Sequence, residues 1–195
     1  MYNIVLFLHL IGVVLLVGSV TITLVSTLRV QTAKTVAELR SLTAATKRIE
    51  VVLAPAMVIL IASGLYMVSQ HSDRGVVPWT AGWVITSLVV AVLLGVIGNT
   101  IEARDAKRLH VAIANASDER PHDELRLLQL ASSPIYSVFF GSSQVVALLY
   151  MMTNKPGLAV SIVACVIAAV VAFAAAAIRM RSVRRVTRTA VTDVV

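Results

Sequence analysis

The chain is organised by five long apolar stretches that are separated by short polar segments. The stretches cover residues 3–25, 51–70, 79–100, 133–152 and 157–179. A helix needs about 20 mostly apolar residues to cross roughly 30 Å of hydrocarbon, because each residue adds about 1.5 Å. The pattern therefore predicts an all-α, polytopic membrane bundle with five transmembrane helices. We expect one membrane domain over residues 1–180 and a basic tail over residues 181–195.

Composition agrees with a membrane protein. Of the 195 residues, 58% are hydrophobic and only 14% are charged, and the mean hydropathy is +0.87. Soluble domains carry more charge, about a quarter of their residues. No basic residue precedes the first apolar stretch and no small-residue cleavage pattern follows it. We therefore expect this stretch to be retained as a transmembrane helix.

Lysine and arginine are distributed unevenly between the two sides that this threading defines. Fifteen of the 17 fall in the segments after the first, third and fifth stretches. The positive-inside rule then predicts an N-terminus outside and a C-terminus in the cytoplasm of a multi-pass protein of the plasma (inner) membrane. The basic run from Arg179 to Arg188 would contact anionic lipid headgroups. We therefore expect the basic residues behind the net charge of +7 to orient the protein in the membrane and to contact the bilayer. We expect no nucleic-acid partner.

Two polar segments on the predicted cytoplasmic side show helix patterns of their own. Thr35-Val-Ala-Glu38 matches a capping box, so the second helix should begin in the cytoplasm, and Pro55 should kink it. Residues 101–108 are typical of a helical continuation in water. A short helix opened by Asp118-Glu-Arg-Pro121 should follow and lie on the bilayer surface through Leu125 and its apolar neighbours.

Motifs of soluble catalysis are absent from the sequence. There is no Walker loop, no G-x-G-x-x-G after a strand, no C-x-x-C and no H-E-x-x-H. All ten Asp and Glu residues lie in loops, at helix ends or in the tail. No buried carboxylate is therefore expected, which argues against a pump or an ion-driven transporter. The single cysteine, Cys165, allows no intramolecular disulfide.

His9 is the most unusual polar residue within the apolar stretches. It lies about six residues below the outer end of its helix, on the order of 10 Å into the membrane. Polar residues of three other helices fall at a similar depth, which predicts a shared polar layer. An imidazole N–H in hydrocarbon needs a partner, and the amide of Gln144 is the best candidate. The other predicted members of this layer are Ser63, Thr86, Ser87 and Ser143.

Two interpretations of the layer remain open. In the first, it joins the helices, and small residues let the backbones approach each other. In the second, His9 ligates haem b or copper, because neutral imidazole is a common ligand for both. The further ligand candidates are Met67 and His71 on the second helix, with Met151 and Met152 on the fourth. The glycines of the first interpretation are Gly12, Gly18, Gly64 and Gly141.

Phe7-Leu-His-Leu-Ile-Gly12 resembles the opening helix of the CopD-like superfamily of small bacterial integral membrane proteins. The superfamily includes copper-resistance CopD proteins, haem-binding HemJ-type protoporphyrinogen oxidases and uncharacterised families, and the chain is most similar to one of the uncharacterised families. The resemblance implies that His9 is the residue that would bind haem or copper. HemJ-type proteins carry basic residues within the membrane region, and their absence from the spans here argues against protoporphyrinogen oxidation. The other features of the resemblance, over residues 3–156, are Gly18, Pro55, Gly64-Leu-Tyr66, Trp79, Trp83 and Met151-Met-Thr-Asn-Lys155-Pro156.

Three function hypotheses follow from the sequence. The leading one is an integral membrane protein without a catalytic site that acts through packing, either alone or as an accessory subunit with other membrane subunits. The second is a haem b or copper protein that uses His9. The third is a protein that handles a small solute or a lipid in a shallow outer pocket. Tight packing around the polar layer would argue against the third hypothesis.

Overall fold

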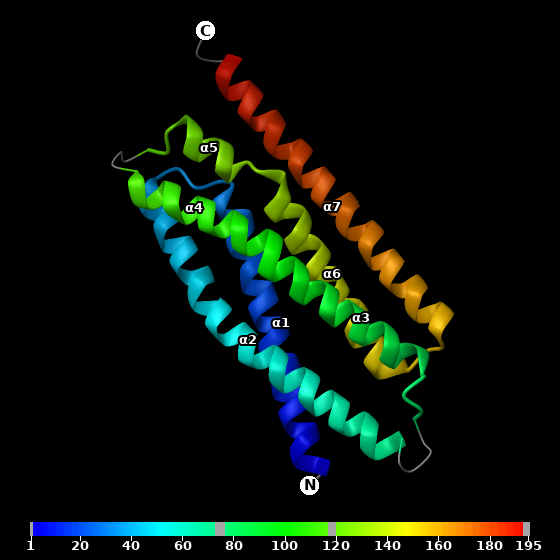
Figure 1. Ribbon diagram of the computed structural model, residues 1–195. Coiled ribbons are helices and arrows are strands. Elements are labelled where there is room, and N and C mark those ends of the chain that lie inside the picture. Colours follow the sequence, from blue (N-terminus) through cyan, green and yellow to red (C-terminus); the bar gives the residue numbers. More distant parts are fainter. Residues whose placement is uncertain (1, 73–76, 117–119, 193–195) are drawn as a thin grey trace.

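The computed structural model describes residues 2–72, 77–116 and 120–192, apart from the side chains of residues 50, 71, 72 and 184–192 (Figure 1). These residues form seven α-helices and one π-helical turn, η1, and no strand. The elements are α1 (Tyr2–Val30), α2 (Val36–Ser72), α3 (Gly82–Ile97), η1 (Gly98–Glu102), α4 (Ala103–Asn115), α5 (Asp123–Gln129), α6 (Ser132–Asn154) and α7 (Leu158–Thr192).

Five helical stretches of the described chain are long and apolar enough to cross a membrane, which confirms the all-α, five-helix prediction. Each stretch begins or ends beyond the apolar residues that predicted it, because the helices continue into the polar segments. The stretches are Tyr2–Val30, Val36–Gln70, Gly82–Asn115, Asp123–Asn154 and Leu158–Val183.

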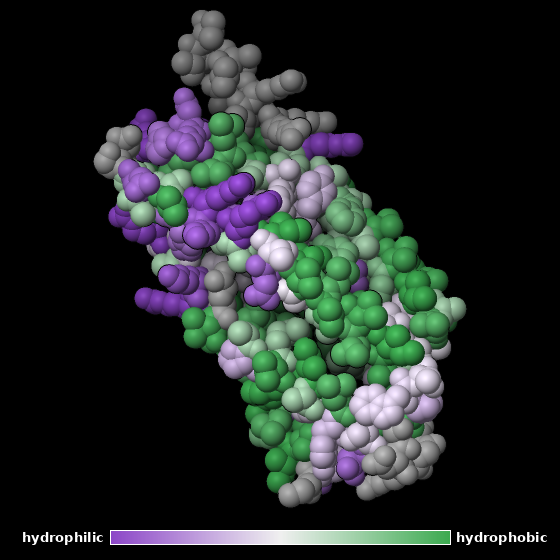
Figure 2. Space-filling model, viewed as in Figure 1, coloured by the Kyte–Doolittle hydropathy of each residue, from purple (hydrophilic) through white to green (hydrophobic). Residues whose placement is uncertain are grey.

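The helices form one elongated bundle, in which α1 is packed along α2 and also contacts α6 (Figure 1). On the other side of α6, α7 and α3 pack against it and against each other. Most of the large apolar side chains on α3 and α7 are exposed, as expected for surfaces that face hydrocarbon. Figure 2 shows that hydrophilic residues gather at the end of the bundle that carries α4 and α5, here called the α5 end.

The start of α2 confirms the predicted capping box. The backbone N–H of Glu38 donates to Thr35 Oγ1 at 3.2 Å, and the Glu38 carboxylate accepts the N–H of Lys34 at 3.1 Å. The threonine thereby satisfies one of the backbone donors that a helix start leaves without partners, and the glutamate accepts the N–H of the residue just before the cap. From this start α2 continues as one helix through Pro55 to Ser72.

The α5 end has a small apolar core of its own. Val36 and Leu39 of α2, Ile113 of α4 and Leu125 of α5 are buried together. The expectation that Leu125 lies on the bilayer surface is wrong, because its side chain is 0% exposed. The helix turns Leu127 outward instead, with 73% of that side chain exposed. At an end that meets water, burying Leu125 removes apolar surface from solvent.

Close helix contacts occur at some of the predicted glycines and at one other. A Cβ built at Gly12 would lie 3.3 Å from Leu60 Cα, so Gly12 lets α1 approach α2. Nothing lies within 4 Å of such an atom at Gly18. The tightest position is Gly82, where a Cβ would lie 2.8 Å from Leu158 Cβ and closer still to the Leu158 backbone. The starts of α3 and α7 therefore meet through a glycine.

Candidate functional site

His9 on α1 forms its hydrogen bonds with α2. Its Nδ1 lies 3.0 Å from Ser63 Oγ and 3.2 Å from the carbonyl oxygen of Leu60. Gly64 leaves room for the ring, since a Cβ there would lie 3.4 Å from His9 Cε1. The packing of α1 along α2 thus fixes both the position and the orientation of the imidazole.

The partners of Nδ1 determine the tautomer of His9. A carbonyl oxygen only accepts, so we assign the ring proton to Nδ1, which donates to Leu60 and Ser63. The Ser63 hydroxyl is free to accept because its own hydrogen points to the carbonyl oxygens of Ile59 and Leu60. Nε2 therefore carries a lone pair and has no hydrogen-bond partner in the described part of the chain.

His9 lines a cavity of about 430 Å³ near the N-terminal end of the bundle, here called the His9 cavity. Its walls come from α1, α2, α3 and α6, and most of the lining side chains are apolar. Because α2 packs mainly on α1 while α3 packs on α6 and α7, space remains between α2 and α3. The region around His9 is therefore not filled by side-chain packing.

Ser87 on α3 supplies a second polar group to the His9 cavity. Its Oγ is buried and has no hydrogen-bond partner among the residues described. Several other hydroxyls in the spans bond to their own helix: Thr86 donates to the Gly82 carbonyl oxygen at 2.8 Å and Ser142 to that of Val138 at 2.7 Å. A buried polar group without a partner costs on the order of 1–3 kcal/mol. His9 and Ser87 are thus two polar residues of one cavity that a ligand could contact.

Gln144 is not the partner of His9, contrary to the prediction. Its side chain is 2% exposed, and Nε2 donates to the Cys165 carbonyl oxygen on α7 at 3.0 Å. Ser143 Oγ donates to Phe140 of its own helix at 2.9 Å. Depth along a helix does not reveal its rotation, and α6 turns Gln144 toward α7. The predicted layer is therefore divided between the α1–α2 contact, the His9 cavity and the α6–α7 contact.

The candidate ligands for a metal or haem iron are only partly brought together. Met67 and Met152 line the His9 cavity with His9, whereas Met151 is fully buried beside Val90 and Leu148. The side chain of His71, the remaining candidate, lies outside the described residues. No group of three or more His, Cys, Asp or Glu that could hold a metal ion occurs within the described ranges. A metal site here would rest on one imidazole and thioether sulfurs.

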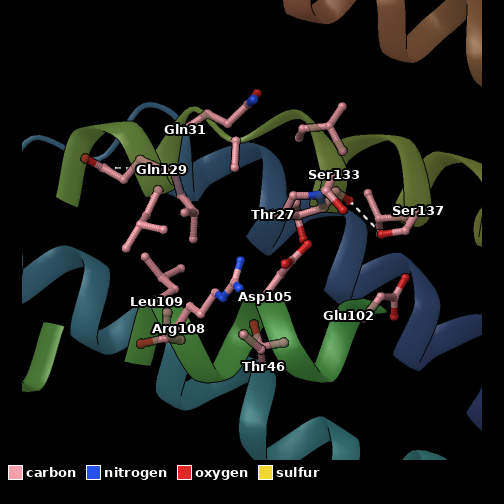
Figure 3. A pocket seen from close by; sticks show the side chains of 18 of the residues that line it. Thr27, Gln31, Thr46, Glu102, Asp105, Arg108, Leu109, Gln129, Ser133 and Ser137 are labelled. Atoms are coloured by element: carbon pink, nitrogen blue, oxygen red, sulfur yellow. Dashed lines mark hydrogen bonds between the residues drawn. The ribbon is translucent and has the colours of Figure 1, made fainter. Parts of the chain in front are cut away.

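A second cavity, of about 450 Å³, lies at the α5 end and is here called the Asp105 cavity (Figure 3). Residues of α1, α2, α4, α5 and α6 line it, and many are polar, in contrast to those of the His9 cavity. Sequence reasoning missed this cavity because its polar residues lie where helix ends and loops were expected. The one available hint was the spacing of Thr23 and Thr27, four residues apart on one face of α1.

Asp105 and Arg108 point from α4 into this cavity, Asp105 toward Thr27 and Ser133 (Figure 3). Asp105 Oδ2 is buried and has no hydrogen-bond partner within residues 2–72, 77–116 and 120–192. The expectation that no carboxylate is buried is wrong for this atom. The π-helical turn η1 immediately precedes α4, and such a turn adds a residue that changes which side chains face the bundle.

The walls of the Asp105 cavity are braced at the last turn of α1. Gln129 Nε2 donates to the carbonyl oxygens of Val30 and Ala33, at 3.0 and 3.2 Å. Arg179 of α7 donates from Nε to Gln31 Oε1 at 3.2 Å and from Nη2 to the Leu28 carbonyl oxygen at 3.4 Å. These contacts satisfy carbonyl groups that a helix end leaves without partners, and the arginine also suits the negative end of the helix dipole.

Five apolar helices with a cavity near each end define a polytopic integral membrane protein. The family described as a predicted integral membrane protein (DUF2269) matches residues 3–156, and the chain belongs to this family. The match covers the region from α1 to the end of α6, so α7 lies beyond it. None of the curated proteins and none of the solved structures matches the chain.

Proposed function

We propose that the protein binds a lipid-like alcohol in the His9 cavity, which develops the small-solute or lipid hypothesis. The observation that carries the proposal is the pair of polar groups in this cavity, His9 Nε2 and Ser87 Oγ, that have no hydrogen-bond partner in the described chain. A single hydroxyl can donate to Nε2 and accept from Ser87. The apolar walls would then contact the hydrocarbon part of the ligand.

Tryptophan fluorescence can test this proposal, because Trp83 lines the His9 cavity. In a Trp79→Phe background Trp83 is the only tryptophan. A brominated long-chain alcohol should quench Trp83 saturably, and a brominated alkane of the same length should bind less tightly. His9→Leu and Ser87→Ala should each weaken binding of the alcohol by about five- to tenfold, the value of one hydrogen bond, and leave binding of the alkane unchanged.

Ser143→Ala is the matched control, because Ser143 belongs to the predicted polar layer but bonds to its own helix and does not line the cavity. This variant should bind the alcohol as the wild type does. Quenching that never saturates, or equal affinity for the alcohol and the alkane, would contradict the proposal. That result would favour the leading sequence hypothesis of a structural or accessory subunit.

Haem b or copper binding is a second candidate, and the hydrogen bond from His9 Nδ1–H to Leu60 favours it. Ligating histidines commonly donate the other ring N–H to a backbone carbonyl, which orients Nε2. Met67 and Met152 line the same cavity, and thioethers with imidazole suit copper(I) or a haem with His and Met ligands. One basic side chain, Lys155, also lines the cavity and could contact a porphyrin carboxylate.

The absorption spectrum of the purified protein, expressed with haem and copper supplied, tests this candidate. A Soret band or stoichiometric copper that disappears in His9→Ala but persists in His110→Ala would support it. His110 lies at the α5 end and does not line the His9 cavity. A spectrum without a Soret band, together with substoichiometric copper, would eliminate the candidate.

We further propose that the protein resides in the plasma membrane with its N-terminus outside. The support is that 15 of the 17 basic residues lie on the side of the α5 end. The basic residues that follow Arg179 would then contact anionic headgroups. Membership of the CopD-like superfamily is part of this proposal and is supported by the Phe7–Gly12 segment and the placement of His9.

A further inference from the structure

Two acidic and two basic residues line the Asp105 cavity, and the carboxylate of Asp105 does not pair with the guanidinium of Arg108. The other two charged residues are Glu102 and Arg104. Arg108 forms no hydrogen bond or ion pair with the described residues, and Asp105 Oδ2 has no partner among them. Side chains three residues apart on a helix normally lie close enough to interact. Here both point into the cavity (Figure 3). A ligand that carries both charges would satisfy both side chains.

We infer that this cavity binds the zwitterionic headgroup of an aminophospholipid, with its phosphate on Arg108 and its ammonium on Asp105. A guanidinium binds phosphate oxygens through two parallel N–H donors. A carboxylate oxygen accepts a hydrogen bond from an ammonium N–H. The hydroxyl groups of Thr27 and Ser133 line the same cavity and add further polar partners.

The mixed charge of the cavity lining favours a zwitterion over a ligand with a single charge. A lone cation would satisfy Asp105 but would be repelled by Arg108 one turn away. A lone anion would satisfy Arg108 but would be repelled by Asp105. Asp105 Oδ2 is buried, and a buried charge is costly unless it is paired. Arg108 is exposed, so this cost falls on the carboxylate. A zwitterion compensates both side chains and brings no net charge into the cavity.

The position of the cavity favours a lipid over a soluble molecule. It lies where the apolar helix surfaces give way to the hydrophilic α5 end (Figure 2). Headgroups lie at this boundary of a membrane protein. A soluble zwitterion such as phosphoethanolamine has the same chemistry, and the experiment must separate the two sources.

Lipid retention by the full-length protein tests the inference. The protein is exchanged into nanodiscs of phosphatidylethanolamine, phosphatidylcholine and phosphatidylglycerol in equal amounts, extracted, and analysed by native mass spectrometry. We expect phosphatidylethanolamine to be retained about tenfold over the other two, because a hydrogen bond to a charged group contributes roughly a factor of ten or more. The methylated ammonium of phosphatidylcholine has no N–H, and phosphatidylglycerol has no ammonium.

Variants assign the retention to the two charged residues. Asp105→Asn and Arg108→Gln should each reduce retention of phosphatidylethanolamine about tenfold. Lys107→Gln is the matched control and should behave as the wild type, since Lys107 is exposed on the same helix and does not line the cavity. If Arg108→Gln does not fold, Arg108→Lys keeps the charge but loses the two-pronged contact, and it should still lower retention.

Each outcome bears on the inference. Equal retention of the three lipids without binding of free phosphoethanolamine, or unchanged retention in folded Asp105→Asn and Arg108→Gln, would overturn it. If free phosphoethanolamine binds the wild type but not these variants, and no lipid is preferred, the cavity binds a zwitterion. The inference that this zwitterion is a lipid headgroup would then be wrong. Neither result depends on the His9 cavity, which lies near the opposite end of the bundle.

Discussion

Gly82→Ala is expected to remove most of the correctly folded protein. A Cβ at residue 82 would overlap the backbone of Leu158, the first residue of α7, and would lie 2.8 Å from its Cβ. Because the obstructing atoms are backbone, no side-chain rotation relieves the overlap, and the starts of α3 and α7 must separate. We expect the free energy of unfolding to fall by at least about 2–3 kcal/mol, which is the upper end of the range for an overpacked contact.

Size-exclusion profiles and thermal unfolding in detergent measure this effect. Gly18→Ala is the matched control, because nothing lies within 4 Å of a Cβ at Gly18 in the middle of α1. Alanine in an open helical position should leave stability unchanged or raise it by about 0.5–1 kcal/mol. A Gly82→Ala protein with the yield and melting temperature of the wild type would show that α3 and α7 do not meet at this point.

The spans could be predicted from the sequence because hydropathy and length determine them almost alone. In a membrane every backbone polar group must be satisfied within the segment, so a long apolar stretch has one available structure. Local polar chemistry was also predictable, as the hydrogen bonds around Thr35 and Glu38 confirm. These features depend on residues close together in the chain.

The rotation of each helix could not be predicted in the same way. In lipid the outward face is as apolar as the inward face, so apolar periodicity does not mark the packed side. In α7, Val163 and Val170 are exposed, whereas the smaller Ala176 and Ser161 are fully buried. The partner of Gln144 depends on this rotation, which explains why its predicted contact with His9 was wrong.

The two cavities differ in how far the sequence could reveal them. His9 is an evident exception within an apolar stretch, so it could be selected without a structure. Its partner Ser63 belonged to the predicted layer, but the lack of a partner for Ser87 depends on the space between α2 and α3. Asp105 and Arg108 occur among many charged residues at a helix start, where polar residues need no explanation. Only the three-dimensional arrangement distinguishes these two residues from the other charged residues nearby.

Leu125→Ala is expected to destabilise the α5 end far more than Leu127→Ala. Leu125 is fully buried with Leu39 and Ile113, whereas Leu127 on the same helix is 73% exposed. This core lies at the hydrophilic end, where the alternative to packing is water rather than lipid, so the full hydrophobic effect applies. Truncating a buried leucine lowers the free energy of unfolding by about 2–5 kcal/mol. Truncating an exposed leucine changes it by about 0.5 kcal/mol or less.

Hydrogen exchange localises this effect to the region where α5 docks. In Leu125→Ala the amides of α5 and of the first turns of α2 should exchange faster, because both helices lose a buried neighbour. Protection in α6 and α7 should stay the same, since neither contributes a residue to this core. The Asp105 cavity shares α5 with the core through Gln129, so Leu125→Ala should also weaken lipid retention there while leaving alcohol binding at His9 intact. Unchanged exchange in α5 would mean that Leu125 does not hold this helix against α2 and α4.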